Sequence, residues 1–153
     1  EELENGSFAT IYLSPKDYHR IHMPCNGVLI SMKYIPGNLF SVNQKTVNQV
    51  KRIFARNERL ICLFDTDFGV MAFVLVGAIF VGSMQTEWQG QITPPYSKTV
   101  INYDYKGREI RLAKGDELGR FNMGSTVIML LPEDFPEMKL HAGQQLKMGQ
   151  ALI

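Results

Sequence analysis

The sequence has few cysteines and almost no net charge, and both shortages exclude classes of function. Its 153 residues include two cysteines, Cys25 and Cys62, each among apolar neighbours. Their number and spacing provide neither a disulfide framework nor a metal-binding motif, so we expect two buried, reduced thiols in a cytoplasmic protein. The 16 basic and 15 acidic residues nearly cancel. Because nucleic-acid binding calls for a clustered basic excess, we expect no nucleic-acid partner.

The sequence also lacks a recognisable signal peptide and, in our interpretation, a membrane-spanning helix. It opens on two glutamates without a basic segment followed by an apolar one, so we expect an internal start. Residues 68–86 carry no charge, which permits a membrane helix. However, Gly69, Gly77 and Gly82 interrupt them, and their apolar part is rich in Val, Ile and Phe. That composition favours two buried strands separated by a bend.

What the sequence does contain is mostly a β pattern. Short apolar runs rich in β-branched and aromatic residues alternate with breakers such as Pro36-Gly37, Pro94-Pro95 and Pro132. With 45% hydrophobic residues, the chain is large enough to form one domain with its own core. The predicted strands cover residues 7–13, 27–34, 60–65, 70–76, 79–84, 90–92, 99–105, 110–112 and 125–131.

Two short segments predict helices. The segment 14–17 begins with a cap serine, has proline at the first helical position and carries an acid three residues after the cap. Pro24 ends this predicted helix, which would place His19 and His22 on one face. A second short packing helix is predicted over residues 47–54, where apolar residues form a stripe.

Glycine pairs within residues 114–119 and 141–149 indicate tight turns, through positive φ or close backbone approach. This pattern is similar to the hybrid barrel-sandwich of biotinyl and lipoyl domains. We therefore expect a mainly β (α+β) fold, with a barrel-sandwich-hybrid-like β core and two or three short helices. Such a likeness of fold says nothing by itself about chemistry.

The most informative motif is Gly124-Ser125-Thr126. Alone, it indicates only a turn that enters a strand. Two further motifs precede it, YLSPKDYHRIHMP at residues 12–24 and FARNER at residues 54–59. In this order, and with shorter matches between them, the three motifs closely resemble the phosphatidylserine decarboxylases. The resemblance extends from about residue 8 to the C-terminus.

The resemblance implies that Ser125 becomes a covalent pyruvoyl cofactor. Decarboxylation of an amino acid leaves electrons on Cα, and a keto group can accept them where no side chain can. The cofactor forms when the serine hydroxyl attacks the preceding carbonyl, so residue 124 must be uncrowded, and Gly124 meets that need. Thr126 is a weaker candidate for positioning the turn or for bonding the developing oxyanion. Met123 stands where the family most often has leucine, an apolar residue of similar size.

The chain has three histidines, and histidine is well suited to move protons near neutral pH. By the resemblance, His22 is the base that activates Ser125 during maturation, and His19 handles protons in decarboxylation. Two other interpretations of this pair are open: a zinc pair, which lacks a third ligand at a telling spacing, and a structural helix. We predict no metal site. His141 lies outside the family motifs and is expected to be a solvated surface histidine.

The aspartate that orients the activating histidine in the family has no counterpart in this sequence. By the resemblance it lies upstream of Glu1, in a region associated with membrane binding. Asp17 is better explained as a helix-cap acid. In the FARNER motif, Arg56, Glu58 and Arg59 either bind a substrate phosphate or carboxylate or form an internal ion-pair network.

The resemblance as a whole implies a single catalytic domain over residues 1–153, self-cleaved into a larger fragment 1–124 and a pyruvoyl-bearing fragment 125–153. The implied reaction converts phosphatidylserine to phosphatidylethanolamine and carbon dioxide, at the cytoplasmic face of a bacterial membrane. The sequence leaves open whether the chain forms a homodimer. Two alternatives are a biotinyl- or lipoyl-like carrier modified at Lys147, which has no neighbouring acid, and a pyruvoyl decarboxylase of a soluble amino acid.

Overall fold

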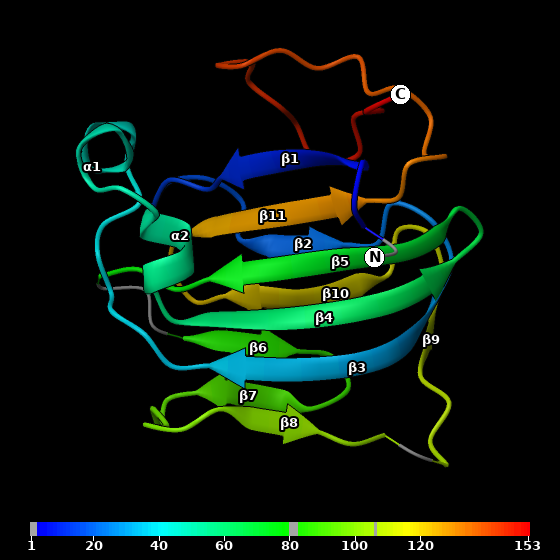
Figure 1. The fold of residues 1–153 in the computed structure, drawn as a ribbon, viewed down its shortest axis with the longest axis horizontal. Coiled ribbons are helices and arrows are strands. Elements are labelled where there is room, and N and C mark those ends of the chain that lie inside the picture. The colour runs from blue at the N-terminus through cyan, green and yellow to red at the C-terminus, as the bar shows by residue number, and fades with distance from the viewer. Residues whose placement is uncertain (1–2, 80–82, 106) are drawn as a thin grey trace.

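The structure is a computed structural model that describes residues 3–79, 83–105 and 107–153, and it consists of two antiparallel sheets with two short helices. The mainly β prediction with two or three short helices is confirmed. The elements shown in Figure 1 are β1 (Ser7–Tyr12), β2 (Arg20–His22), β3 (Gly27–Ile35), α1 (Gln44–Gln49), α2 (Ile53–Arg56), β4 (Arg59–Thr66), β5 (Gly69–Val76), β6 (Met84–Thr86), β7 (Gly90–Thr93), β8 (Ile101–Tyr103), β9 (Arg111–Leu112), β10 (Glu117–Phe121) and β11 (Thr126–Leu131).

The seven-stranded sheet has the order β1, β11, β5, β4, β3 and β8, with β9 also paired to β3. The four-stranded sheet has the order β2, β10, β6 and β7. In Figure 1 the smaller sheet lies behind the larger one, and the C-terminal segment folds beyond β1. Buried residues of both sheets join one hydrophobic cluster, so the core lies between the two sheets.

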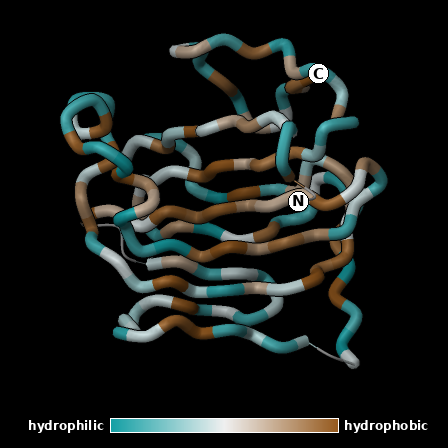
Figure 2. The backbone as a smooth tube through the Cα atoms, in the orientation of Figure 1, coloured by the Kyte–Doolittle hydropathy of each residue, from teal (hydrophilic) through white to brown (hydrophobic). Residues whose placement is uncertain are grey.

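The hairpin of β4 and β5 is the centre of this core. Leu60, Cys62 and Phe64 alternate along β4 and are completely buried, as a strand with one buried face requires. Phe64 packs edge-on against Phe73 of β5 and against Trp88, which follows β6. Figure 2 shows hydrophobic residues gathered along the central strands, whereas α1 is mostly hydrophilic.

Both cysteines are buried and free, which confirms the prediction of reduced thiols. The Cys25 thiol lies 3.7 Å from the sulfur of Met71. Burial raises the pKa of both thiols, because a thiolate would lose its hydration in the core. Cys25 and Cys62 therefore pack as apolar groups.

Most predicted strands are confirmed, with ends that differ by a few residues. The exception is the strand predicted over residues 79–84, because β6 begins only at Met84 and residues 80–82 lie outside the described residues. The uncharged run contributes β5 to the core rather than a helix. In the described ranges, no helix combines the length and the hydropathy needed to cross a membrane.

The predicted helix over residues 14–24 is wrong. Its cap does form, because the backbone N–H and the hydroxyl of Ser14 both donate to the Asp17 carboxylate, at 2.8 and 2.7 Å. The cap closes a single turn, and the chain then enters β2, which pairs with β10. Buried side chains alternate with more exposed ones over residues 21–25. This two-residue period is typical of a strand. We had instead interpreted the three-residue spacing of His19 and His22 as helical.

The second predicted helix, over residues 47–54, is divided into two. Val50 ends α1 in an extended conformation, and Arg52 precedes α2 with a φ of 57°, in the left-handed region. Ile53 at the start of α2 is buried, whereas α1 buries no residue completely. The expected apolar stripe is therefore presented by two separate turns of helix.

The strand β10 was not expected, because its glycines indicate turns. Gly115 does turn with a φ of +91°, but Gly119 lies inside the strand. A Cβ on Gly119 would come within 2.3 Å of the Gln85 carbonyl oxygen in β6. Glycine is needed there so that the backbones of β10 and β6 can approach each other.

Candidate maturation and active site

Ser125 lies where the chain passes from the four-stranded sheet to the seven-stranded one. Residues 122–125 connect β10 to β11. The side chain of Ser125 is completely buried, and its hydroxyl donates a hydrogen bond to the Val76 carbonyl at the end of β5. Its own carbonyl accepts the N–H of Leu13 at 2.7 Å. The candidate nucleophile is thus held between the chain segments on either side of it.

Gly124 is required by a close approach of two backbones. An added Cβ would lie 2.3 Å from the Leu13 carbonyl oxygen, 2.6 Å from the Ser14 carbonyl carbon and 2.7 Å from the Pro15 nitrogen. These are backbone atoms, which cannot rotate aside. Gly124 does not have a positive φ, so the need for glycine comes from packing rather than from backbone freedom.

We expect Gly124→Ala to destabilise the fold by about 1–3 kcal/mol, because the new methyl group forces two backbone segments apart. Thermal and denaturant unfolding followed by circular dichroism measures the change. Gly143→Asn is a control, because Gly143 has open space around its Cβ position and a φ of +81° that asparagine tolerates. Equal stability of Gly124→Ala and the parent would contradict the close approach.

His22, at the end of β2, has both ring nitrogens occupied. Nδ1 lies 2.8 Å from the Gly115 carbonyl oxygen, and Nε2 lies 2.8 Å from the Tyr18 hydroxyl. A carbonyl oxygen only accepts, so in the neutral ring Nδ1 carries the proton and Nε2 accepts from Tyr18. His22 is therefore arranged as a base at Nε2. Tyr18, which also stacks on the ring at 5.8 Å, is a partner that our sequence reasoning missed although it lies within the quoted motif.

His19 lies just before β2 and contacts the segment that leads to Ser125. Its carbonyl accepts the N–H of Phe121, the last residue of β10, at 3.1 Å. Its Nδ1 is buried and has no hydrogen-bond partner among the described residues. His19 and His22 do not share a helical face as expected, because His22 belongs to a strand. No hydrogen bond in the described part of the chain joins either histidine to Ser125.

Four buried side-chain polar atoms lack a hydrogen-bond partner within the described ranges, and they lie in the three sequence motifs and in β10. A buried polar atom without any partner costs about 1–3 kcal/mol of stability, and Glu117 Oε1 differs from the other three because the Arg120 guanidinium lies 3.8 Å from it. Thr126 directly follows Ser125, and Glu117 pairs with His22 across β10 and β2. The four atoms are His19 Nδ1, Glu58 Oε1, Glu117 Oε1 and Thr126 Oγ1.

The FARNER motif is buried beside β5, where that strand ends. The completely buried Asn57 donates its side-chain amide to the carbonyls of Phe40 and Gly77, at 2.8 and 2.9 Å. Glu58 is 2% exposed, and its Oε2 accepts the Tyr34 hydroxyl at 2.8 Å. Burial raises the pKa of Glu58, and the bond from Tyr34 offsets only part of that effect. Asn57 is a structural residue that the sequence reasoning missed.

Among the residues that the structure describes, the ion-pair network considered for this motif does not form. Arg56 lies over the Phe40 ring, 4.8 Å from its centroid. Arg59 donates to the Asn57 carbonyl at 3.1 Å. Neither arginine makes an ion pair with a described residue. The motif is held by hydrogen bonds and a cation–π contact instead.

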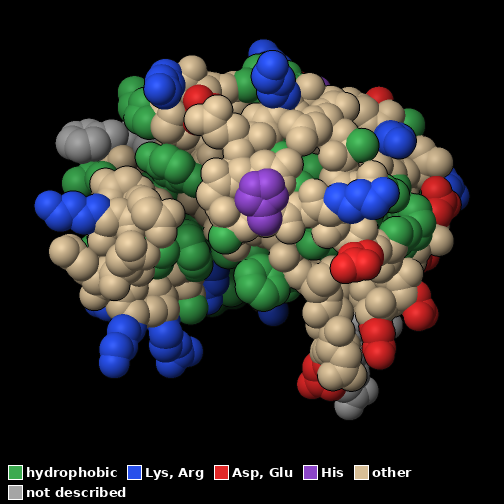
Figure 3. All heavy atoms as spheres, turned by 90° about the horizontal axis from the view of Figure 1, so that it is seen from above, with side chains coloured by type: hydrophobic (Ala, Val, Ile, Leu, Met, Phe, Trp, Pro, Cys, Tyr) green, Lys and Arg blue, Asp and Glu red, His purple; other side chains and the backbone are tan. Residues whose placement is uncertain are grey.

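The remaining sequence candidates lie elsewhere. His141 is exposed, as predicted, and Lys147 is exposed before a turn. Hydrogen bonds from Ser14 lower the pKa of Asp17, whose cap role is confirmed for a single turn. Among the described residues, no three side chains are grouped to hold a metal ion. Figure 3 shows basic and acidic side chains on the same face, with no single sign covering it.

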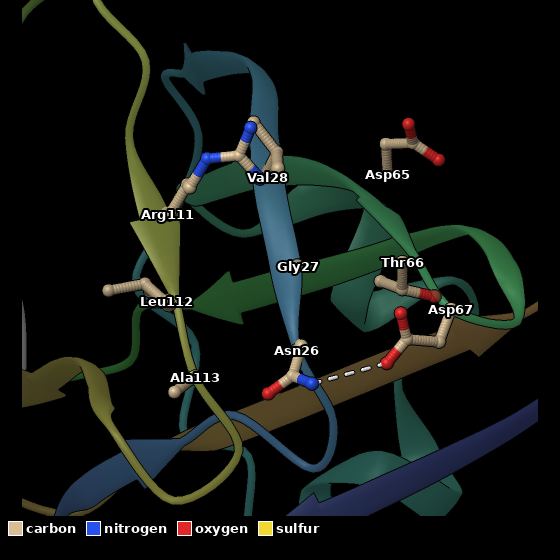
Figure 4. A pocket seen from close by; sticks show the side chains of 9 residues that line it. All are labelled: Asn26, Gly27, Val28, Asp65, Thr66, Asp67, Arg111, Leu112 and Ala113. Atoms are coloured by element: carbon tan, nitrogen blue, oxygen red, sulfur yellow. Dashed lines mark hydrogen bonds between the residues drawn. The ribbon is translucent and has the colours of Figure 1, made fainter.

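A hollow of about 380 Å³ opens between the start of β3, the end of β4 and β9 (Figure 4). The Asn26 amide donates to the Asp67 carboxylate at 3.3 Å across it, and the Asn26 oxygen accepts the N–H of Lys114 at 3.0 Å. These polar groups satisfy one another. The hollow contains none of the candidate site residues, and it is lined by Asn26, Gly27, Val28, Asp65, Thr66, Asp67, Arg111, Leu112 and Ala113.

The three sequence motifs lie within a chain whose entire length matches one protein family. Residues 1–153 match the family model described as phosphatidylserine decarboxylase. The chain belongs to the phosphatidylserine decarboxylase family. Similar proteins from Methylococcus capsulatus, Nitrosococcus oceani and Vibrio parahaemolyticus are each named phosphatidylserine decarboxylase proenzyme. They are 55%, 58% and 54% identical to this chain, over 99%, 96% and 97% of its length.

The chain spans about half the length of these curated relatives. The matched segment covers 54%, 49% and 54% of the three proteins, respectively. Family membership therefore applies to the whole of this chain, and the activity of the whole protein is taken up below as a proposal.

Proposed function

We propose that this chain is the catalytic part of a pyruvoyl-dependent phosphatidylserine decarboxylase, a carboxy-lyase that converts phosphatidylserine to phosphatidylethanolamine and carbon dioxide. The observation that carries the proposal is the Gly124–Ser125 bond of the family motif. It lies in a connection where a side chain at position 124 would collide with backbone, and where the serine hydroxyl is buried. Membership of the family supports the assignment.

Cleavage at this bond needs no oxidant. The Ser125 hydroxyl oxygen bonds to the Gly124 carbonyl carbon as the C–N bond breaks, and its proton ends on the freed nitrogen. Loss of the Cα proton of residue 125 then breaks the Cβ–Oγ bond and releases Gly124 as a carboxylate. One water replaces the nitrogen, which leaves as ammonia, and a pyruvoyl group remains at position 125.

Two groups of the candidate site fit such a group. A pyruvoyl group presents carbonyl oxygens and no donor, and both the Thr126 hydroxyl and His19 Nδ1 are buried without a partner. When present, the group supplies an electron sink for decarboxylation. In our proposal Thr126 holds a carbonyl oxygen, and His19 holds the proton that is delivered to the substrate Cα. His22 Nε2 takes the proton of the Ser125 hydroxyl during maturation.

The two fragments, 1–124 and 125–153, remain one domain in this proposal. β11 belongs to the smaller fragment, and it lies between β1 and β5 of the larger one. Its ladder runs from Tyr12↔Thr126 to Ser7↔Leu131 on the β1 side and from Thr126↔Val76 to Leu130↔Ala72 on the β5 side. A break at residue 124 removes none of these strand pairs.

The proposed substrate is a membrane lipid, so we propose that the protein works as a peripheral protein at the cytoplasmic face of a bacterial membrane. The test is carbon dioxide release by the complete open reading frame, with phosphatidylserine vesicles or soluble serine as substrate. We expect release from the lipid and none above background from serine. Release from serine alone would contradict the lipid as substrate and would favour a decarboxylase of a soluble amino acid.

A further inference from the structure

Glu58 lies in the same row of the seven-stranded sheet as Ser125. The registers of β4 with β5 and of β5 with β11 meet at Val76. Continued by one residue, the two registers place Glu58 and Ser125 opposite Gly77, and the Gly77 N–H extends the β4 side of the ladder by donating to the Glu58 carbonyl at 2.8 Å. Directly opposed residues of antiparallel strands project to the same face. Glu58 and Ser125 therefore share one face, on either side of a glycine.

Gly77 leaves a gap between these two side chains, and the Glu58 carboxyl reaches into it. A Cβ on Gly77 would lie 2.9 Å from Glu58 Oε1 and 3.4 Å from the Leu39 side chain. Adjacent strands are about 4.8 Å apart, and β5 lies between β4 and β11. A group above β5 is therefore about equally far from β4 and from β11. The carboxyl thus extends from β4 over β5, toward the start of β11.

The oxygen that points into the gap has no partner. Glu58 Oε2 accepts the Tyr34 hydroxyl, whereas Oε1 is buried without a hydrogen bond in the described structure. Burial raises the pKa of this carboxyl, and no described basic residue forms an ion pair with it. Both conditions favour the neutral acid, whose O–H is then an unused donor.

We propose that Glu58 is the acid of the second maturation step, in which Gly124 leaves residue 125 as a carboxylate. The inference rests on the proposed function. Once Oγ of Ser125 has been acylated it has no proton to donate, so it loses its bond to the Val76 carbonyl. The oxygen can then turn toward the gap above Gly77. A neutral acid in that gap stabilises the negative charge as the Cβ–Oγ bond breaks, whereas an ionised carboxylate would oppose it.

Glu58→Gln, introduced into the complete open reading frame, tests this role. Glutamine keeps the size of the side chain and an oxygen for Tyr34, but it cannot supply the acidic proton. We expect formation of the mature cut to slow about 100-fold, with little change in unfolding temperature. Because only the second step is affected, the uncut variant should accumulate the ester. Hydroxylamine should then release a fragment that begins with an ordinary serine at position 125, readable by Edman sequencing.

Gly77→Ala provides an independent variant, because its methyl group occupies the gap and displaces the Glu58 carboxyl from it, while the glutamate itself is retained. It should also slow the cut and accumulate hydroxylamine-sensitive ester. Glu109→Gln is the matched control, since Glu109 is an exposed partner of Arg111, and it should mature at the parental rate. A merely structural Glu58 would lower the unfolding temperature of Glu58→Gln and would accumulate no ester.

Parental maturation in Glu58→Gln, without hydroxylamine-sensitive ester, would overturn the inference. If that variant does not fold, parental maturation in Gly77→Ala overturns it equally. Absence of any cut in the parent protein would refute the proposed function and, with it, the role of Glu58. If the parent is cut normally, a negative result for Glu58→Gln refutes the Glu58 assignment alone.

Discussion

Ser125→Ala is expected to yield one uncut, folded chain without decarboxylase activity. The Ser125 hydroxyl is both the attacking group and the source of the cofactor in our account, so its removal eliminates both. The fold should persist, because alanine fills nearly the same space and loses one hydrogen bond to the Val76 carbonyl. Such a bond contributes about 1 kcal/mol. Denaturing gel electrophoresis, circular dichroism and carbon dioxide release measure the three expectations.

The control for this substitution is Ser97→Ala, which removes another serine hydroxyl. That hydroxyl bonds to the Thr99 backbone carbonyl, on the segment between β7 and β8, so the variant should be cut normally. Cleavage of Ser125→Ala at the same bond would show that the Ser125 hydroxyl does not attack the Gly124 carbonyl.

The second large effect should separate the two histidines of the motif. We expect His22→Ala to block the cut, because in our proposal Nε2 is the base that removes the Ser125 proton. We expect His19→Ala to permit the cut but to lower turnover by about 10²- to 10⁴-fold, the usual contribution of a proton-transferring side chain. Gel analysis of the newly made precursor measures the cut, and lipid decarboxylation by the cleaved protein measures turnover.

His141→Ala is the matched histidine control, because His141 is exposed and lies outside the motifs. It should alter neither maturation nor turnover. A parental rate of self-cleavage in His22→Ala would show that His22 is not the base that activates Ser125. Loss of cleavage in His19→Ala, with the fold intact, would show that the two roles cannot be separated.

The central hairpin was predictable from the sequence because its signal is local. Residues 60–64 form an uninterrupted apolar run, and residues 70–76 form a second run rich in Val, so each run by itself indicates a buried strand. The candidate nucleophile was also recognisable, since Gly124 and Ser125 are adjacent and occur with two further motifs in the family's order.

Most of the missed features depend on partners that are distant in the sequence, although residues 21–25 also carried a local two-residue period. β2 replaces the predicted helix because its ladder with β10 extends the sheet, whereas the cap of Ser14 satisfies only one turn. Gly119 fits inside a strand only because β6 approaches its backbone closely. The row of Glu58 and Ser125 depends on the register of three strands. No periodicity within one segment carries that information.

The central claim, that Ser125 becomes a pyruvoyl group, is tested most directly by the intact masses of the purified chains under denaturing conditions, followed by Edman sequencing of the smaller one. The account predicts two chains, divided after Gly124. The smaller chain should begin at position 125, have the mass of a pyruvoyl terminus and resist Edman degradation, because a keto group has replaced its α-amine. A single chain with the summed mass, or a small fragment whose first residue is a readable serine, would contradict it.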